Sequence, residues 1–319
     1  MDLPRVPLIT APTPMHRLPR LSEKLALDLW IKRDDLTGFA MGGNKGRKLE
    51  YLIAAAQSEG ADTVVSCGSL QSNFIRQLGA ACSMFGLRCS AAVMALPHLS
   101  EAERPRERGL LASGGNVVLD ELLGVDLRIF TDGTWDELYV HAKSLAEELR
   151  LEGRKVYEVP VGGSSAIGAY AFFQAGLELQ GQGGFQIPNS KFQIPNSFDW
   201  IVFASSSGST HTGLRYAFHG TNTKVLGIAC DPEPNLIDDF QVLYGELGAL
   251  TGERRPMRRE EWLLNLDFVG PGYGIPSEAG NDAIRLIART EGIFLDPIYT
   301  GKAFAGLIAL AKKGEIGEG

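Results

Sequence analysis

The chain of 319 residues is acidic overall, with 31 Lys and Arg against 38 Asp and Glu and a formal net charge of −7. This balance offers no general attraction to nucleic acid or to an anionic membrane, so any anion-binding site must be local. Residues 1–20 carry prolines where a signal peptide needs an apolar run, and no stretch reaches the roughly 20 apolar residues of a membrane span. We therefore expect a cytoplasmic protein without a nucleic-acid or membrane partner.

The cysteines and histidines do not form the patterns of a disulfide framework or a metal site. The five histidines are scattered, and none is paired with another at i and i+4. The cysteines lack metal-ligand spacing and are too few for a disulfide scaffold. We expect no metal, and four buried thiols at Cys67, Cys82, Cys89 and Cys230.

In chain order, short β-rich runs alternate with amphipathic helical ones, which is typical of parallel sheets covered on both faces. A helix is predicted behind residue 44 by apolar positions three and four apart, and the same period recurs over residues 72–85. A third helix is expected at 134–150, and residues 198–214 pass from a strand through a Ser/Gly loop into a helix. Further strands are expected within residues 27–35, 62–68, 88–96, 155–163 and 224–230.

The length predicts two lobes, because single hydrophobic cores stop growing at roughly 250 residues. We expect the second lobe to begin near Pro160. The sequence FQIPNS occurs twice, at residues 185–190 and 192–197, separated by Lys191. Two copies of six residues are too few for a repeat fold, so we interpret them as a duplicated surface loop without chemistry.

The stretch GGNKGRKLE, residues 42–50, places Lys45, Arg47 and Lys48 behind a candidate N-cap, Asn44. Lys45 would begin a helix and Lys48 would lie one turn on, on much the same face. An amine at the positive end of a helix and beside another cation loses its proton more easily, which prepares it to attack a carbonyl and hold it as a Schiff base. The alternative is a solvated basic helix face.

The stretch SSSGSTHTG, residues 205–213, lies between a predicted strand and a helix, where N–H groups and hydroxyls can cradle a phosphate. Gly208 and Gly213 have the spacing of a nucleotide P-loop, but Leu214 and Arg215 stand where its Lys-Ser/Thr pair belongs. A single phosphate monoester therefore fits better than a triphosphate, and an ordinary turn is the alternative. The stretch PVGGSSAIG, residues 160–168, is a second, weaker Gly/Ser turn.

Two further features carry polar groups in loops. SLQSN, residues 69–73, is a strand-to-helix turn that could hold a carboxylate, although Ser72 could equally be a simple N-cap. Tyr273 and Tyr299 lie in Gly/Pro-rich segments, where phenols beside a cationic cofactor can move protons. Each tyrosine alone is more often a packing residue.

Six motifs in order resemble the 1-aminocyclopropane-1-carboxylate deaminase and D-cysteine desulfhydrase family of pyridoxal-phosphate enzymes, from about residue 8 onwards. They are KRDDLTGFAMGGNKGRKLEYL, QSN..RQ, VPVGGSSAIGAY, GSTHTG, PGYGIP and EGIFLDPIYTGKAFAGL. The resemblance implies the α/β fold of the tryptophan synthase β chain group, with open, mostly parallel sheets. It also implies a large domain of residues 1–45 and 160–319, a small domain of residues 46–159 and pyridoxal 5′-phosphate in the cleft between them.

The resemblance further implies residue roles. Lys45 would be the Schiff-base lysine, Lys48 a phosphate ligand and Arg47 a structural cation. Ser72 would hold a small amino-acid substrate by its carboxylate or move a proton, Tyr273 and Tyr299 would flank that substrate, and Thr300 would border it. The cofactor site would be completed by Asn73, Ser207, Gly208, Ser209 and Thr210, and Asn73 would also bind the substrate. Relatives are commonly homodimers, which implies the same here.

The residue after the second tyrosine indicates the reaction. Ring-opening relatives tend to carry Glu there, whereas this chain has Thr300, as desulfhydrase-like relatives do. We therefore expect β-elimination from D-cysteine, with 1-aminocyclopropane-1-carboxylate deamination as the alternative. Phe74 stands where relatives often have His or Gln, which leaves cysteate-like substrates open.

Other expectations concern the chain end and rival functions. Relatives continue past the segment KKGEIGEG into a final strand and an HTGG-like turn, which this sequence does not contain. A fragment of a longer chain is favoured over a protein that lacks the strand, because losing a buried strand would expose a sheet edge and core. A non-catalytic protein that keeps this fold is the rival from another class. A serine hydrolase is disfavoured, because no Gly-x-Ser-x-Gly elbow occurs and His211 stands in the phosphate-type loop.

Overall fold

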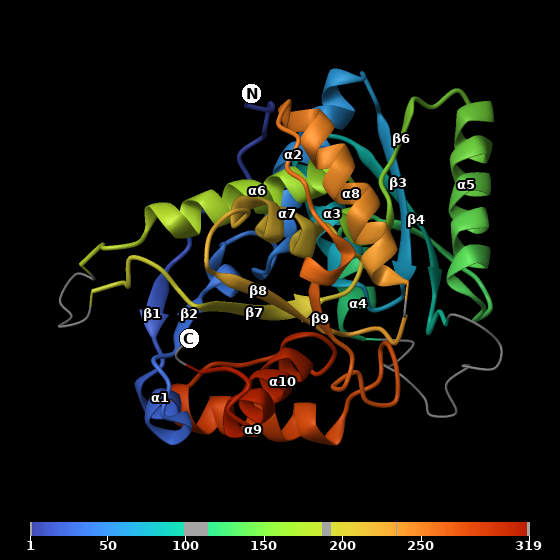
Figure 1. Cartoon of the computed structure of the whole chain (residues 1–319). Helices are drawn as coiled ribbons and strands as arrows, with labels where there is room; N and C mark the ends of the chain where they lie inside the picture. Colours follow the sequence, from blue (N-terminus) through green and yellow to red (C-terminus); the bar gives the residue numbers. More distant parts are fainter. Residues whose placement is uncertain (1, 99–113, 187–192, 234, 318–319) are drawn as a thin grey trace.

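The computed structural model describes residues 2–98, 114–186, 193–233 and 235–317 (Figure 1). One of its sheets is parallel and has the strand order β5-β4-β3-β6. The strand of this sheet that comes first in sequence, TVVSCGS, is buried along nearly all its length because helices cover both of its faces. The strands are β3 (Thr63–Ser69), β4 (Arg88–Met94), β5 (Asp126–Ile129) and β6 (Val156–Glu158), and the covering helices are α2 (Lys45–Ser58), α3 (Asn73–Met84), α4 (Asn116–Leu122) and α5 (Trp135–Leu151).

A second parallel sheet has the order β7-β8-β9, with helices on both faces (Figure 1). Its strands are β7 (Trp200–Ser205), β8 (Lys224–Ala229) and β9 (Leu263–Asn265). One face carries α6 (Ala166–Gly181), α7 (Ser209–Ala217) and α8 (Leu236–Thr251), and the other α9 (Glu278–Glu291) and α10 (Thr300–Lys312). Within the described ranges β7 pairs with β8 alone, and its other side borders a cavity.

Shorter elements join these two layers. An antiparallel pair is formed by β1 (Met15–Arg17) and β2 (Trp30–Lys32), with α1 (Pro19–Leu25) between them in sequence. The 3-10 turns are η1 (Asp34–Leu36), η3 (Val161–Gly163) and η4 (Arg259–Glu261). The helix α2 packs on both α3 and α6, so it contacts the helical layer of each sheet.

The predicted α/β architecture with mostly parallel sheets is confirmed. The strands of the first sheet all fall within residues 46–159, and those of the second within residues 160–319. This partition supports the proposed small and large domains, but their boundaries stay a prediction. The absence of the final strand found in relatives also stays a prediction. Some elements are shorter than predicted: the expected strand at 155–163 ends at Glu158, because Gly162 takes a left-handed conformation inside η3.

The repeated hexapeptide lies only partly within the described residues, whereas all four predicted thiols lie within them. Residues 187–192 lie outside the described part, while Gln186 and Gln193 form an antiparallel bridge beside it. Phe185 of the first copy is 61% exposed and Ile194 of the second is buried, but the counterparts of both residues lie outside the described part. All four cysteines are free and buried, as expected.

A buried network around Arg47 fixes the start of α2. The guanidinium contacts Asp34 at 2.8 and 2.9 Å, Glu178 at 2.9 and 3.0 Å, and the Thr13 hydroxyl at 2.9 Å. Lys32 Nζ lies 2.5 Å from the same Glu178 carboxylate. Arg47 therefore acts as the predicted structural cation, and it ties α2 to η1 and α6.

Replacing Glu178 by Gln should lower the free energy of unfolding by about 2 kcal/mol at pH 7, less than for a fully buried pair because Glu178 is partly exposed. Burial alone would raise the pKa of Glu178, but the hydrogen bonds and charges of Arg47 and Lys32 outweigh it and lower the pKa from 4.5 to about 2. The stabilisation is therefore complete above pH 4.5 and is lost as the pH falls towards 2. Urea unfolding should show the deficit of Glu178→Gln shrinking over that window.

The matched control is Glu147→Gln on α5, whose carboxylate is exposed. It should change the free energy of unfolding by less than about 0.5 kcal/mol. Equal losses in the two variants, or a Glu178→Gln deficit that persists on acidification, would contradict this role of the network.

Candidate active site

A cavity of about 1510 Å³ is lined by residues from both parallel sheets and their helices, and most predicted site residues are among them. They are Lys45, Lys48, Ser72, Asn73, Ser207, Gly208, Thr210, Tyr273, Tyr299 and Thr300. Ser209 is different: its side chain is buried, and its hydroxyl lies near Gly168 of α6 rather than along the cavity. Its predicted part in cofactor binding stays a prediction.

A tight loop delivers Lys45 to this cavity. Gly42 has φ 78°, and a Cβ there would overlap the carbonyl oxygen of Asp35, so only glycine fits. The helix begins at Lys45 as predicted, but the predicted cap is wrong in its chemistry. Asn44 already has helical φ and ψ, and its side chain makes no capping bond.

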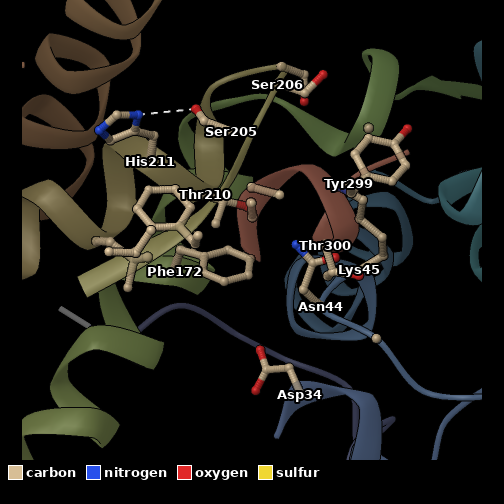
Figure 2. A pocket seen from close by; sticks show the side chains of 18 of the residues that line it. Asp34, Asn44, Lys45, Phe172, Ser205, Ser206, Thr210, His211, Tyr299 and Thr300 are labelled. Atoms are coloured by element: carbon tan, nitrogen blue, oxygen red, sulfur yellow. Dashed lines mark hydrogen bonds between the residues drawn. The ribbon is translucent and has the colours of Figure 1, made fainter. Parts of the chain in front are cut away.

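The amine of Lys45 lies beside the Ser207 turn. A Cβ built on Gly162 would stand 2.8 Å from Ser207 Oγ and 3.9 Å from Lys45 Nζ, so the three groups meet at one point. Figure 2 shows Lys45 next to Tyr299 and Thr300 at the cavity wall. Burial lowers the pKa of Lys45 to about 8, which leaves part of the amine neutral near physiological pH.

Lys48 lies one turn further along α2 and is 1% exposed. Its Nζ donates to the Gly162 carbonyl oxygen at 3.1 Å and lies 5.6 Å from the centroid of the Phe172 ring. Burial, followed by the charge of Lys45, lowers its pKa well below the usual value. No carboxylate pairs with Lys48 in the described part of the chain, so an anionic ligand would restore its preferred charged form.

The loop before α7 makes a turn that requires glycine at position 208. Gly208 has φ 99°, and a Cβ there would lie 2.7 Å from the Phe240 ring. Ser164 is hydrogen-bonded to this loop. Its hydroxyl donates to the Ser207 carbonyl oxygen and accepts the Ser209 N–H at 3.1 Å. Ser164 was not predicted as a site residue, although the Gly/Ser turn containing it is visible in the sequence.

His211 does not serve as a base here. Its Nδ1 lies 3.1 Å from Ser205 Oγ (Figure 2), and its ring packs against Phe203, Phe240 and Trp262. Burial lowers its pKa to about 3, so the imidazole is neutral at physiological pH. Both partners are buried, which argues further against a hydrolase built on this Ser-His pair.

The two tyrosines meet as predicted, with their hydroxyl oxygens 2.8 Å apart. Burial raises the pKa of both phenols, so both carry protons at neutral pH. The ring of Trp135 meets Tyr273 edge-on at 5.4 Å. Behind them, the buried Lys302 amine donates to the Gly272 carbonyl oxygen at 2.8 Å and so holds the backbone next to Tyr273.

Ser72 combines the two roles considered for it. Its hydroxyl oxygen accepts the N–H groups of Phe74 and Ile75 at 3.2 and 3.3 Å, which makes it the N-cap of α3. It also lines the cavity, where its hydroxyl hydrogen can be donated. Phe74 is 2% exposed and belongs to the core cluster below the first sheet, so most of its ring is packing surface.

Thr300, the first residue of α10, is hydrogen-bonded to Asp296. Its hydroxyl donates to Asp296 Oδ2 at 2.6 Å and accepts the Asp296 N–H at 2.8 Å. The other carboxylate oxygen accepts the N–H groups of Ile298 and Tyr299. This turn fixes where Tyr299 enters the cavity.

A low-pKa lysine at the start of a helix, facing a hydroxyl-rich loop at the start of another, defines the site of an enzyme that binds a phosphorylated aldehyde. The chain belongs to the pyridoxal-phosphate dependent enzyme family, whose family model matches residues 6–319. The predicted fold group and cofactor are thereby confirmed.

Named relatives and solved structures also resemble this chain. The chain is 38% identical over 312 residues to proteins named D-cysteine desulfhydrase from Salmonella choleraesuis (strain SC-B67) and Salmonella paratyphi C (strain RKS4594), covering 96% of this chain and 88% of each relative. A crystal structure described as an ACC deaminase homologue superposes with a TM-score of 0.84 at 36% identity, covering 99% of this chain and 90% of that one. O-ureido-L-serine synthase shares the fold at 18% identity, with a TM-score of 0.60 over 94% and 84% of the two chains.

Two further findings concern the described residues only. They contain no helix long and apolar enough to cross a membrane. They also contain no group of three or more His, Cys, Asp or Glu side chains placed to hold a metal ion.

Treating cofactor-free protein with pyridoxal phosphate and then borohydride should label Lys45 ahead of other lysines. Because only the neutral amine attacks the aldehyde, the labelling rate should rise up to pH about 8 and then level off, whereas an amine with the usual pKa of 10.5 would keep gaining reactivity. Peptide mapping by mass spectrometry at each pH gives the profile. Labelling that favours another lysine, or a Lys45 rate still rising steeply above pH 9, would contradict this assignment.

Gly208→Ala should weaken pyridoxal phosphate binding by at least about tenfold, because a methyl group here meets the Phe240 ring and a left-handed backbone. Gly220→Ala is the matched control, since Gly220 has φ 76° but nothing within 4 Å of the added Cβ. The control should cost about 1 kcal/mol of stability and leave cofactor affinity unchanged. Equilibrium dialysis measures both, and equal affinities for the two variants would exclude a phosphate cradle at Gly208.

Proposed function

We propose that this chain is a lyase that eliminates the β-substituent of D-cysteine, giving pyruvate, ammonia and hydrogen sulfide from D-cysteine and water. The curated relatives that it resembles over 96% of its length are named for this activity. The observation that carries the choice of reaction is that Thr300 stands after Tyr299 with its hydroxyl bound to Asp296. The partner we expect is therefore a small amino acid.

The residues around the cavity fit pyridoxal phosphate. Ser207, Gly208 and Thr210 line the cavity at the start of α7, where hydroxyl and N–H groups suit an oxyanion. Lys48 offers a buried cation whose protein partner is a carbonyl oxygen. Lys45 would hold the aldehyde carbon. When bound, the cofactor supplies an electron sink for charge developing at the substrate α-carbon.

Each step of proton transfer has a candidate group in this chain. The free Lys45 amine, with its pKa of about 8, can accept the α-proton of an amino acid held beside it. The paired phenols of Tyr273 and Tyr299 are protonated at neutral pH, and either can donate a proton towards a departing sulfur. Ser72 and Asn73, at the start of α3, can bind the substrate carboxylate.

Thr300 distinguishes elimination from ring opening. A cyclopropane substrate has no α-hydrogen, so opening its ring requires an acid that protonates carbon, and Thr300 offers no carboxyl group. Its hydroxyl is committed to Asp296 by two hydrogen bonds. Elimination needs only a base at the α-carbon and a proton for the leaving group, which Lys45 and the two phenols can supply.

Two alternatives keep specific support. The structural likeness to an ACC deaminase homologue favours 1-aminocyclopropane-1-carboxylate deamination as the runner-up. Cysteate is a further candidate substrate, because its sulfonate is a β-leaving group on the same amino-acid frame. We also propose a homodimer in the cytoplasm, as inferred from the family resemblance.

Purified protein loaded with pyridoxal phosphate should release pyruvate and sulfide in equal amounts, faster from D-cysteine than from L-cysteine, cysteate or 1-aminocyclopropane-1-carboxylate. Lys45→Ala should lose at least about a thousandfold in turnover, because both the cofactor anchor and the base are removed. Keto-acid and sulfide assays measure the products, and Lys143→Ala on the exposed face of α5 is the control.

Other outcomes would redirect the proposal. Faster keto-acid release from 1-aminocyclopropane-1-carboxylate would make ring opening the main reaction. Absence of turnover, together with a visible cofactor absorbance that is the same in Lys45→Ala, would favour a non-catalytic protein with this fold.

A further inference from the structure

Asn116, the first residue of α4, joins the turn before α3 through side-chain hydrogen bonds. Its Nδ2 donates to Asn73 Oδ1 at 3.0 Å and to the Gln71 carbonyl oxygen at 2.8 Å. Its Oδ1 accepts from Arg76 Nη1 at 2.9 Å. The Asn116 backbone N–H also donates to Gln71 Oε1 at 2.9 Å, and Gln71 Nε2 donates to the Gly114 carbonyl oxygen.

Two of these partners have only one possible hydrogen-bonding role. A guanidinium can only donate, so Arg76 requires that the oxygen of the Asn116 amide face it. A backbone carbonyl can only accept, so the Gln71 carbonyl requires that the Asn116 NH2 group face the other way. Both requirements select the same orientation of the Asn116 amide, and the reverse orientation would violate both.

The orientation of Asn116 then determines that of Asn73. Because the Asn116 NH2 group points at Asn73, the carbonyl oxygen of the Asn73 amide must face it. The Asn73 NH2 group is left on the opposite side, and Asn73 lines the cavity. Within the described residues this NH2 group has no recorded protein acceptor.

We propose that Arg76 and Asn116 are positioning residues that fix Asn73 as a hydrogen-bond donor towards the cavity. Asn73 therefore binds an oxygen that accepts, not a group that donates. The proposal rests on the proposed function, in which such an oxygen is carried either by the pyridoxal ring or by the substrate carboxylate. Neither Asn116 nor Arg76 needs to contact the ligand to exert this effect.

Asn116→Asp tests the proposal because it reverses the polarity of the contact with Asn73. It also sets a carboxylate oxygen against the Gln71 carbonyl oxygen, and the Asn73→Ala background separates that local cost from the effect on Asn73. The new carboxylate still accepts from Arg76, but it can no longer donate to Asn73. The Asn73 amide would turn its NH2 group to the carboxylate and present its oxygen to the ligand oxygen. Losing a donor to an anionic oxygen in this way should weaken binding by at least about tenfold.

The measured quantities separate the two sources of the oxygen. If the ring oxygen is bound, the dissociation constant of pyridoxal phosphate, from equilibrium dialysis, rises at least about tenfold in Asn116→Asp. If the substrate carboxylate is bound, cofactor affinity is unchanged and KM rises by a similar factor while kcat changes little. Asn116→Ala, which removes the partner without reversing it, should show a smaller change in the same quantity.

A double-mutant cycle excludes a merely structural role. In an Asn73→Ala background there is no amide to orient, so Asn116→Asp should have no further effect on either quantity. An additive loss there, or unchanged cofactor affinity and KM in Asn116→Asp itself, would overturn the proposal. Failure of wild-type protein to bind pyridoxal phosphate would instead overturn the proposed function.

Discussion

The buried guanidinium of Arg47 is the interaction on which the placement of the site depends. It lies on the first turn of α2, two residues after Lys45, and its hydrogen bonds reach η1 through Asp34 and α6 through Glu178. Such a network is rigid, because removing one partner leaves an uncompensated buried charge. The amine of Lys45 is therefore held against Gly162 and Ser207 by contacts made outside the cavity.

The three cations near the start of α2 differ in what neutralises them. Arg47 has two carboxylates, whereas Lys48 has a carbonyl oxygen and Lys45 faces the cavity. Burying an amine without an anion is unfavourable, and both lysines have lowered pKa values as a result. The site thus favours a ligand that brings negative charge to Lys48 and a carbonyl carbon to Lys45, which is why an acidic chain gathers basic residues at this helix.

Local sequence signals predicted the elements that carry the cavity but not the contacts that orient its side chains. The helical period behind residue 44 and the Gly/Ser loop before α7 placed Lys45 and Gly208 correctly, because both depend on backbone chemistry within a few residues. The capping role of Asn44 was wrong, since the glycine loop imposes helical φ and ψ one residue early. Ser164 and Asn116 were not predicted, because their partners lie about forty residues away in sequence.

Two cations beside the cavity, Arg76 and Lys302, share one property: their charged side chains can only donate hydrogen bonds. Arg76 directs the Asn116 amide, and Lys302 directs the Gly272 carbonyl beside Tyr273. A donor-only cation cannot adapt to a reversed partner, so each one imposes a single orientation on the amide or peptide next to it. Polar groups oriented before the ligand arrives need little reorganisation when it binds, which is the condition for effective electrostatic stabilisation. The orientation of these polar groups therefore depends on cations that need no contact with a ligand to impose it, Lys302 being fully buried and Arg76 partly so.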